Sequence, residues 1–177
     1  MTTWDEVGTR YGADKASWHH NYLPHYESLM AGRKVRRMLE IGVAGGRSLA
    51  LWREVLPEAF IVGIDIEPSC LVHQRERSPV VLADATDGAK MWALNTLYGP
   101  FDIIIDDGSH VHEDVRAAHE GLYPRLADGG LYIIEDLDPA HEWVTRFVAR
   151  NHGRVIVPES APASRDVPSS LLVFDKP

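Results

Sequence analysis

The ten residues 101–110, FDIIIDDGSH, constrain the fold of this chain more than any other stretch. Three consecutive isoleucines, 103–105, suit a strand that is covered on both faces, as a central strand of a parallel sheet is. Directly after them come Asp106 and Asp107, a Gly-Ser pair that allows a tight turn, and His110. Open α/β sheets bind their ligands at the carboxyl ends of the strands. The stretch therefore predicts a central parallel strand that ends in a functional site.

The length and composition predict one domain and narrow the range of partners. At 177 residues and 45% hydrophobic, the chain can form one well-packed core but not two. Its formal charge of -8 and its pI near 5.5 argue against nucleic acid as a partner, because binding to phosphates depends on lysine and arginine. A single cysteine excludes an internal disulfide, and neither a signal peptide nor an apolar stretch of membrane-spanning length is present. We therefore expect a cytoplasmic protein that acts on neither nucleic acid nor membranes.

A strand, a glycine-rich turn and a helix follow one another between residues 35 and 56. Residues 35–41, VRRMLEI, have the pattern of a strand, and Gly42, Gly45 and Gly46 form the turn before a helix that Pro57 ends. This order lets the backbone approach a ligand and points the helix N-terminus at it, as in nucleotide sites. A glycine-rich turn alone can also have a purely steric purpose. The NAD fingerprint would need glycine where this chain has Ala44, which argues against a dinucleotide.

Two acids follow the next two predicted strands. Asp65 ends the strand 60–66, about twenty residues beyond the glycine turn, where a carboxylate can accept both hydroxyls of a ribose. Asp84 follows the short strand 80–82 and could meet the exocyclic amine of an adenine. The alternative for Asp84 is to cap the predicted helix 88–97, a role for which Thr86 and Asp87 also compete.

A second acidic pair lies at the end of the predicted fifth strand. Apolar residues at helical spacing predict a helix over 111–122, and the strand 131–134 that follows it ends in Glu135 and Asp136. If this strand neighbours the central one, Asp107 and the pair lie side by side and repel one another unless a cation or protons intervene. Oxygen donors without cysteine favour a hard ion such as magnesium or calcium, with manganese possible. The alternative is that these acids cap helices or are solvated.

The two ends of the chain complete the predicted organisation. Two helices separated by the turn 12–15 are predicted before the sheet, and a group of polar and aromatic side chains between them either lines a substrate mouth or packs and caps the helices: Asp14, Lys15, Trp18, His19, His20, Tyr22 and His25. After the fifth strand we expect a helix over 140–151 and strands over 154–158 and 171–174, joined by a loop over 159–170. Cys70 has no partner that would make it a nucleophile.

Several of these segments together resemble one enzyme family. The segments LEIGVAGGRSLALW, GIDI, FDIIIDDGSH and GGLYIIED resemble the class I S-adenosylmethionine-dependent methyltransferases. More narrowly, they and the N-terminal YGADKASWHHNYLPHYE are similar to the metal-dependent O-methyltransferases that act on macrolide sugars, of the mycinamicin and macrocin type. The resemblance covers nearly the whole chain. It implies an α/β fold with a doubly wound, mostly parallel, seven-stranded Rossmann-like sheet over residues 34–177 and a helical, substrate-side segment over residues 1–33.

The resemblance also implies a role for each matching residue. The methionine part of S-adenosylmethionine would lie along Glu40, Gly42, Gly45 and Ser48, its ribose would be held by Asp65 and its adenine by Asp84, and Asp106 would face the cofactor. Mg²⁺ or another hard divalent cation would be bound by Asp107, Glu135 and Asp136. The general base would be His110. Two departures stand out. Ala83 and Ala85 flank Asp84 where relatives tend to have glycine and glutamine, and the larger macrolide enzymes carry an additional N-terminal region, so the acceptor can differ.

The resemblance implies an O-methyltransferase that acts on a hydroxyl of a sugar or another diol-bearing small molecule, in natural-product or antibiotic biosynthesis. Coordination of a diol to the metal would orient the hydroxyl and lower its pKa, and His110 would take the proton. Two other classes stay open. Enzymes of the cephalosporin hydroxylase type resemble the same motifs, and a cofactor-binding partner without activity is possible. We also expect a homo-oligomer, because a second subunit could close the site.

Overall fold

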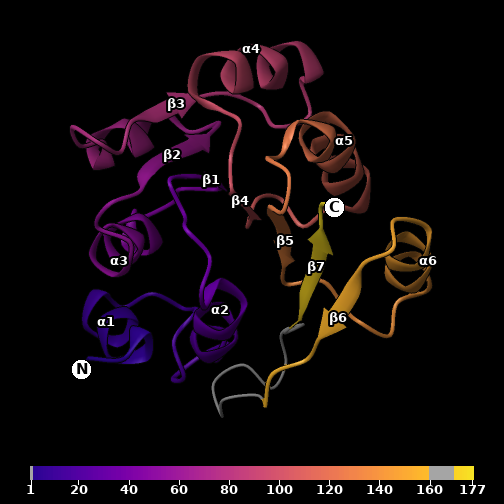
Figure 1. The fold of residues 1–177 in the computed structure, drawn as a ribbon, viewed down its shortest axis with the longest axis horizontal. Helices are drawn as coiled ribbons and strands as arrows, with labels where there is room; N and C mark the ends of the chain where they lie inside the picture. The colour runs from indigo at the N-terminus through magenta and orange to yellow at the C-terminus, as the bar shows by residue number, and fades with distance from the viewer. Residues whose placement is uncertain (1, 160–169) are drawn as a thin grey trace.

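Seven strands form one sheet in the order β3-β2-β1-β4-β5-β7-β6 in the computed structural model, which describes residues 2–159 and 170–177 (Figure 1). The strands are β1 (Arg37–Ile41), β2 (Phe60–Asp65), β3 (Val80–Leu82), β4 (Ile103–Asp106), β5 (Leu131–Glu135), β6 (Arg154–Ile156) and β7 (Leu171–Asp175). The pairs from β3 to β5 are parallel, and β7 is antiparallel to both of its neighbours. The mostly parallel, seven-stranded sheet predicted from the sequence is therefore confirmed.

The strand 103–106 is central, as its run of isoleucines predicts. It pairs with β1 on one side and with β5 on the other. In this register Asp106 lies opposite Ile41 of β1 and opposite Ile134 of β5. The carboxyl ends of the three strands are therefore level, and the side chains that follow them meet at one edge of the sheet.

Helices cover both faces of the sheet (Figure 1). They are α1 (Trp4–Tyr11), α2 (Leu23–Met30), α3 (Arg47–Val55), α4 (Gly88–Tyr98), α5 (His112–Leu122) and α6 (Glu142–Arg150), with short 3-10 turns η1 (Pro68–His73) and η2 (Tyr123–Arg125). Ile103 and Ile105 pack into the core shared with α1, α2 and α3, whereas Ile104 packs into the core shared with α4, α5 and α6. Burial of alternate residues on opposite faces explains why β4 is apolar without interruption.

The predicted elements and the observed ones agree to within a few residues, with two qualifications. The strand predicted over 154–158 ends at Ile156, and η1 has no counterpart among the predictions. The loop predicted over 159–170 falls almost wholly outside the described residues. Within the described part of the chain, no helix is long and apolar enough to cross a membrane.

Gly42 lets the turn after β1 touch the turn after β4. Its φ is +88°, in the left-handed region that favours glycine. A Cβ added at this position would lie 2.1 Å from the carbonyl oxygen of Asp107, far inside contact distance. The two turns therefore approach each other at a point where no side chain fits.

We expect Gly42→Ala to lower the free energy of unfolding by about 2 kcal/mol or more, because alanine is strained at this φ and the backbone of Asp107 must move. Gly88→Ala is the matched control, since a Cβ there has open space and no positive φ. It should stay within about 1 kcal/mol of the original protein. Urea denaturation of the two variants measures the difference. Equal stabilities would contradict the close approach of the two turns.

Candidate active site

Two adjacent cavities lie along the carboxyl ends of the parallel strands. The first, of about 430 Å³, is lined by residues that follow β1, β2, β3 and β4, together with residues of α5. The second, of about 480 Å³, lies between the turn after α1, the glycine turn, the turn after β4 and Asp136. Gly42, Ala44, Asp107 and Gly108 line both cavities. A ligand in the first cavity therefore reaches the wall of the second.

Asp65 is held rigidly at the edge of the first cavity. Its Oδ2 accepts hydrogen bonds from the backbone N–H groups of Val43 (2.8 Å) and Ala44 (3.0 Å), and its Oδ1 accepts one from Glu67 (2.9 Å). Burial alone would raise the pKa of Asp65, but these amide donors lower it below its usual value. Asp65 is thus an ionised, fixed acceptor, as a residue that binds ribose hydroxyls must be.

Asp84 also lines the first cavity. Its Oδ1 accepts from the backbone N–H (2.8 Å) and the hydroxyl (2.7 Å) of Thr86. Asp87 caps α4, because its side chain accepts from the backbone of Ala89 and Lys90. The capping role that competed for Asp84 therefore belongs to Asp87, and the Asp84 carboxylate is left at the cavity.

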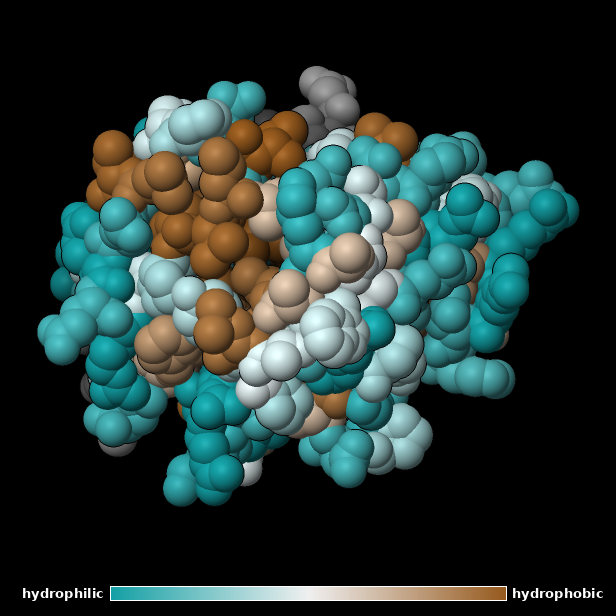
Figure 2. All heavy atoms as spheres, turned by 90° about the horizontal axis from the view of Figure 1, so that it is seen from above, coloured by the Kyte–Doolittle hydropathy of each residue, from teal (hydrophilic) through white to brown (hydrophobic). Residues whose placement is uncertain are grey.

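The rest of the first cavity is largely apolar. Ile66 is 66% exposed at its rim, and the small side chains of Ala83 and Ala85 line it further in. Figure 2, which views the molecule from above, shows apolar side chains gathered on the face where β3 and α4 lie. Leu82 of β3 and Trp92 of α4 are among the exposed apolar residues of these elements. An apolar slot with carboxylates at its ends suits a flat base joined to a hydroxylated sugar.

Asp106 and Glu40 are buried acids beside the cavities. Asp106 lines the first cavity, its Oδ2 lies 3.2 Å from the Tyr132 hydroxyl that donates to it, and burial raises its pKa to about 7. Glu40 lies beneath the glycine turn and lines neither cavity, but its Oε1 accepts from Trp52 Nε1 (3.0 Å). Its Oε2 has no hydrogen-bond partner among the described residues. Gly45 and Ser48, by contrast, line the second cavity.

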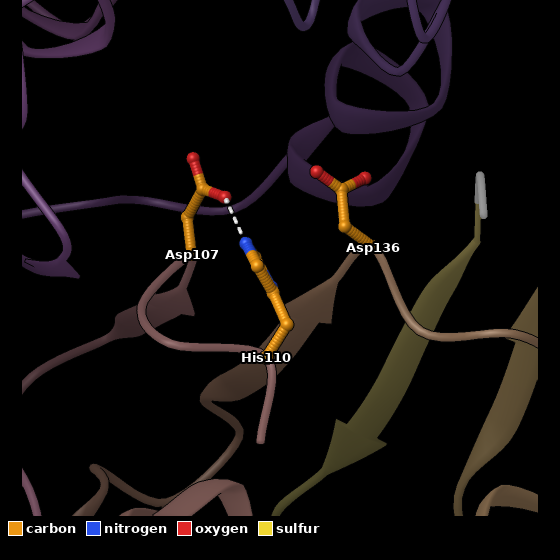
Figure 3. A group of neighbouring side chains, drawn as sticks. All are labelled: Asp107, His110 and Asp136. Carbon is orange, nitrogen blue, oxygen red and sulfur yellow. Dashed lines mark ion pairs between the residues drawn. The ribbon is translucent and has the colours of Figure 1, made fainter. Parts of the chain in front are cut away.

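Asp107, His110 and Asp136 converge at the second cavity (Figure 3). Each offers one ligand atom, and these atoms all lie within 4.8 Å of one another. His110 Nε2 lies 3.8 Å from Asp107 Oδ1. His110 (φ 57°) and Asp136 (φ 59°) both have left-handed backbones, which are uncommon for residues other than glycine and tend to occur at functional sites. The two turns therefore direct three side chains to one point.

Glu135 is not one of these three converging residues, although it lies beside Asp107 as predicted, because both carboxylates contact Lys15 Nζ. It is 1% exposed, and its Oε1 accepts from the Tyr26 hydroxyl (2.5 Å). Its Oε2 accepts from Lys15 Nζ at 2.9 Å. Glu135 ends β5, whereas Asp136 has left the strand with a positive φ, so the two carboxylates diverge. The structure thus brings together Asp107, Asp136 and the predicted base, and gives Glu135 other partners.

Lys15 belongs to the site, although the sequence indicates no specific role for it within the N-terminal cluster. Its side chain is fully buried, and Nζ donates to Asp107 Oδ2 (2.5 Å) as well as to Glu135. Burial opposes the charge of Lys15, but Asp107 and Glu135 raise its pKa well above the usual value, so that it stays protonated. Tyr22 donates to Asp136 Oδ1 at 2.5 Å. The buried members of the N-terminal cluster therefore pack against the acids, whereas Trp18 remains exposed.

The buried Glu40 should make stability depend on pH. Burial raises its pKa from 4.5 to about 7, although Lys15 and Trp52 oppose the shift. The folded protein then binds a proton that the unfolded chain has released, so the contribution of Glu40 to stability is greatest below pH 4.5 and is lost as the pH rises through about 7. The loss should approach about 3 kcal/mol. Glu40→Gln should make the profile less steep, with Asp106 contributing the remaining slope, as measured by urea denaturation across this range. The exposed Glu76→Gln should leave the profile unchanged.

Comparisons with known proteins agree with this geometry. A family model described as "Methyltransferase domain" matches residues 39–137. Demethylmacrocin O-methyltransferase of Streptomyces fradiae is 38% identical over 148 residues, which are 77% of this chain and 37% of that protein. Mycinamicin VI 2''-O-methyltransferase of Micromonospora griseorubida is 36% identical over 145 residues, 77% of this chain and 36% of that protein. This chain therefore spans little more than a third of the length of these two relatives.

A solved structure extends the likeness to nearly the whole chain. The MycE methyltransferase in complex with Mg, SAH and mycinamycin VI has a TM-score of 0.78 and 27% identity, and the match covers 98% of this chain and 54% of that one. The sheet order is that of a Rossmann-like methyltransferase. Because the family model covers more than half of the sequence, from β1 to just beyond β5, the chain belongs to the methyltransferase domain family.

Proposed function

We propose that the chain is an S-adenosylmethionine-dependent O-methyltransferase that uses a divalent metal ion and acts on a hydroxyl of a sugar or another diol-bearing small molecule. The observation that carries this proposal is the convergence of Asp107, His110 and Asp136 at the second cavity, next to the apolar first one. The relatives support it, since they are named as O-methyltransferases of macrolides. A role in natural-product biosynthesis, such as antibiotic biosynthesis, follows from the same likeness.

The first cavity fits the nucleoside of S-adenosylmethionine. Asp65 would hold the ribose, Asp84 the adenine amine, and Asp106 would face the cofactor from the end of β4. The glycine turn leads from this cavity into the second, where Gly45 and Ser48 would lie beside the methionine. Glu40 remains a predicted contact of the methionine part, although in this structure it is buried and lines neither cavity.

The second cavity fits a hard divalent ion such as Mg²⁺. Asp107 and Asp136 offer carboxylate oxygens, the donors that such ions prefer, and His110 lies beside them. Glu135 remains a predicted ligand, but in this structure its oxygens accept from Tyr26 and Lys15. Gly12 and Asp14 also line the cavity, which supports the N-terminal residues 1–33 as its substrate side within one domain.

The residues of the chain divide the reaction between them. When bound, S-adenosylmethionine supplies an electrophilic methyl group, and a divalent ion supplies positive charge at the acceptor diol. At Nε2, His110 would accept the proton of the acceptor hydroxyl that is to be methylated. Asp107, with Oδ1 3.8 Å from Nε2, stabilises the imidazolium that forms. Gly42 holds the two turns, and hence donor and acceptor, in one fixed relation.

We further propose that the acceptor is a glycosylated small molecule rather than nucleic acid, because the formal charge of -8 disfavours binding to phosphates.

We also propose a cellular compartment and an assembly state. The single cysteine suits a reducing compartment such as the cytoplasm. A homo-oligomer is proposed because the second cavity is open and a second subunit could close it.

Removal of metal tests the proposed activity. Glycosides with vicinal hydroxyls are incubated with S-adenosylmethionine and Mg²⁺, and mass spectrometry detects a single added methyl group. We expect a chelator to abolish the transfer and excess Mg²⁺ to restore it. Undiminished transfer in excess chelator would contradict the metal site. Turnover that requires ferrous iron and oxygen would place the chain in the hydroxylase class instead.

His110→Ala tests the general base. We expect turnover to fall about 10²- to 10⁴-fold, while the affinity for the cofactor, measured by calorimetry, stays unchanged. His152→Ala is a matched control, because His152 has nearly the same left-handed φ (56° against 57°) and lines neither cavity. It should keep full turnover. If both variants are equally active, His110 is not the base.

A further inference from the structure

Lys15 lies before residues 39–137, the part of the chain that matches the family, but its side chain contacts the carboxylates at the ends of β4 and β5. It lies in the turn between α1 and α2, and its Nζ contacts residues that are 92 and 120 positions further along the chain. Its side chain has no exposure to solvent. An ammonium group buried in this way is costly unless charged partners surround it. Here the partners are Asp107 at 2.5 Å and Glu135 at 2.9 Å, which follow or end neighbouring strands.

We propose that Lys15 is a positioning residue that serves as a built-in counter-cation of the metal site. It holds the ends of β4 and β5 together before any divalent ion arrives, and it sets the charge that the ion meets. This inference rests on the proposed metal site, and it adds a residue that supplies no ligand atom to the ion.

The arrangement of oxygens supports this role. Lys15 and His110 lie on opposite sides of the Asp107 carboxylate: Nζ contacts Oδ2, whereas His110 Nε2 faces Oδ1. Lys15 therefore leaves Oδ1 of Asp107, the oxygen that faces His110, available to an ion. Its second contact draws Glu135 Oε2 towards Asp107, although two carboxylates would otherwise repel each other.

The charges support it as well. Asp107, Glu135 and Asp136 would carry three negative charges when ionised, and Lys15 leaves two, which one divalent ion balances. The phenols of Tyr22 and Tyr26 donate to Asp136 and Glu135 without changing the charge. Lys15 is the only one of these three donors from the N-terminal segment that supplies a positive charge. Without it, a second cation or a proton would have to take its place.

The test compares three variants. Lys15→Met keeps a long apolar stem and removes the charge. Tyr26→Phe is the matched control, because it removes a neutral hydrogen bond to the same Glu135. Lys15→Met combined with Glu135→Gln removes one positive and one negative charge and so restores the balance. For each protein, the melting temperature is measured in chelator and in saturating Mn²⁺, and Mn²⁺ affinity is measured by electron paramagnetic resonance.

We expect the thermal stability of Lys15→Met to depend on bound metal. Its melting temperature should fall in chelator and rise with Mn²⁺ by at least twice the rise seen for the original protein, and it should bind Mn²⁺ at least tenfold more tightly because a nearby positive charge is gone. Tyr26→Phe should respond to Mn²⁺ like the original protein. The double variant should be stable in chelator again.

The outcomes separate this inference from the proposed function. If the original protein does not bind Mn²⁺, the proposed metal site is wrong, and the inference is wrong with it. If the original protein binds Mn²⁺ but Lys15→Met responds to it no more than Tyr26→Phe, only the inference is wrong. If Lys15→Met folds neither in chelator nor in Mn²⁺, a folded double variant supports the role of charge. If neither Lys15→Met nor the double variant folds, Lys15 acts through packing and the inference is overturned.

Discussion

The repulsion between carboxylates at the ends of β4 and β5 is the constraint on which the rest of this structure depends. Parallel pairing places Asp106 opposite Ile134, so the acids that follow each strand must lie close together. Bringing like charges together in a buried setting is unfavourable unless donors and cations compensate. The protein compensates with groups from one N-terminal segment: the ammonium of Lys15 and the phenols of Tyr22 and Tyr26. The acids at the sheet edge therefore fix where that segment packs.

The same edge couples the two cavities. The carbonyl oxygen of Asp107 lies 2.1 Å from where a Cβ of Gly42 would be. The turn after β4, which carries Asp107 of the proposed metal site, therefore touches the glycine turn, which would bind the cofactor. Asp65 binds the glycine turn from the other side through the backbone of Val43 and Ala44. A shift of either turn would therefore move both cavities. Methyl transfer requires donor and acceptor to be aligned, and this contact supplies a rigid reference for both.

Local sequence patterns predicted most of the fold because the physical causes are local. An uninterrupted β-branched run between turns, such as 103–105, indicates a strand buried on both faces, and the helices follow from their apolar spacing and from proline and glycine at their ends. The positions of Asp65 and Asp107 at strand ends were predictable for the same reason. The short turn η1 has no such periodic pattern, and the sequence did not reveal it.

Two features of the site depend on long-range packing and could not be predicted in this way. The contact of Lys15 with Asp107 joins residues 92 positions apart, and nothing in the turn that holds Lys15 indicates which acids it meets. The separation of Glu135 from Asp136 depends on a left-handed backbone at an aspartate, a conformation that sequence alone rarely indicates. The sequence thus predicted which acids gather at the edge, but not which of their oxygens remain free.

The partners of each acid decide where the site carries negative charge. Asp65 and Asp84 are bound by N–H and hydroxyl donors that lower their pKa values, so they stay ionised at the mouth of the first cavity. Asp106 and Glu40 are fully buried, and burial raises their pKa values to about 7. Around the first cavity, negative charge is therefore strongest on Asp65 and Asp84 and weaker on the buried Asp106 and Glu40. Such a distribution would attract a cationic cofactor without concentrating unbalanced charge in the core.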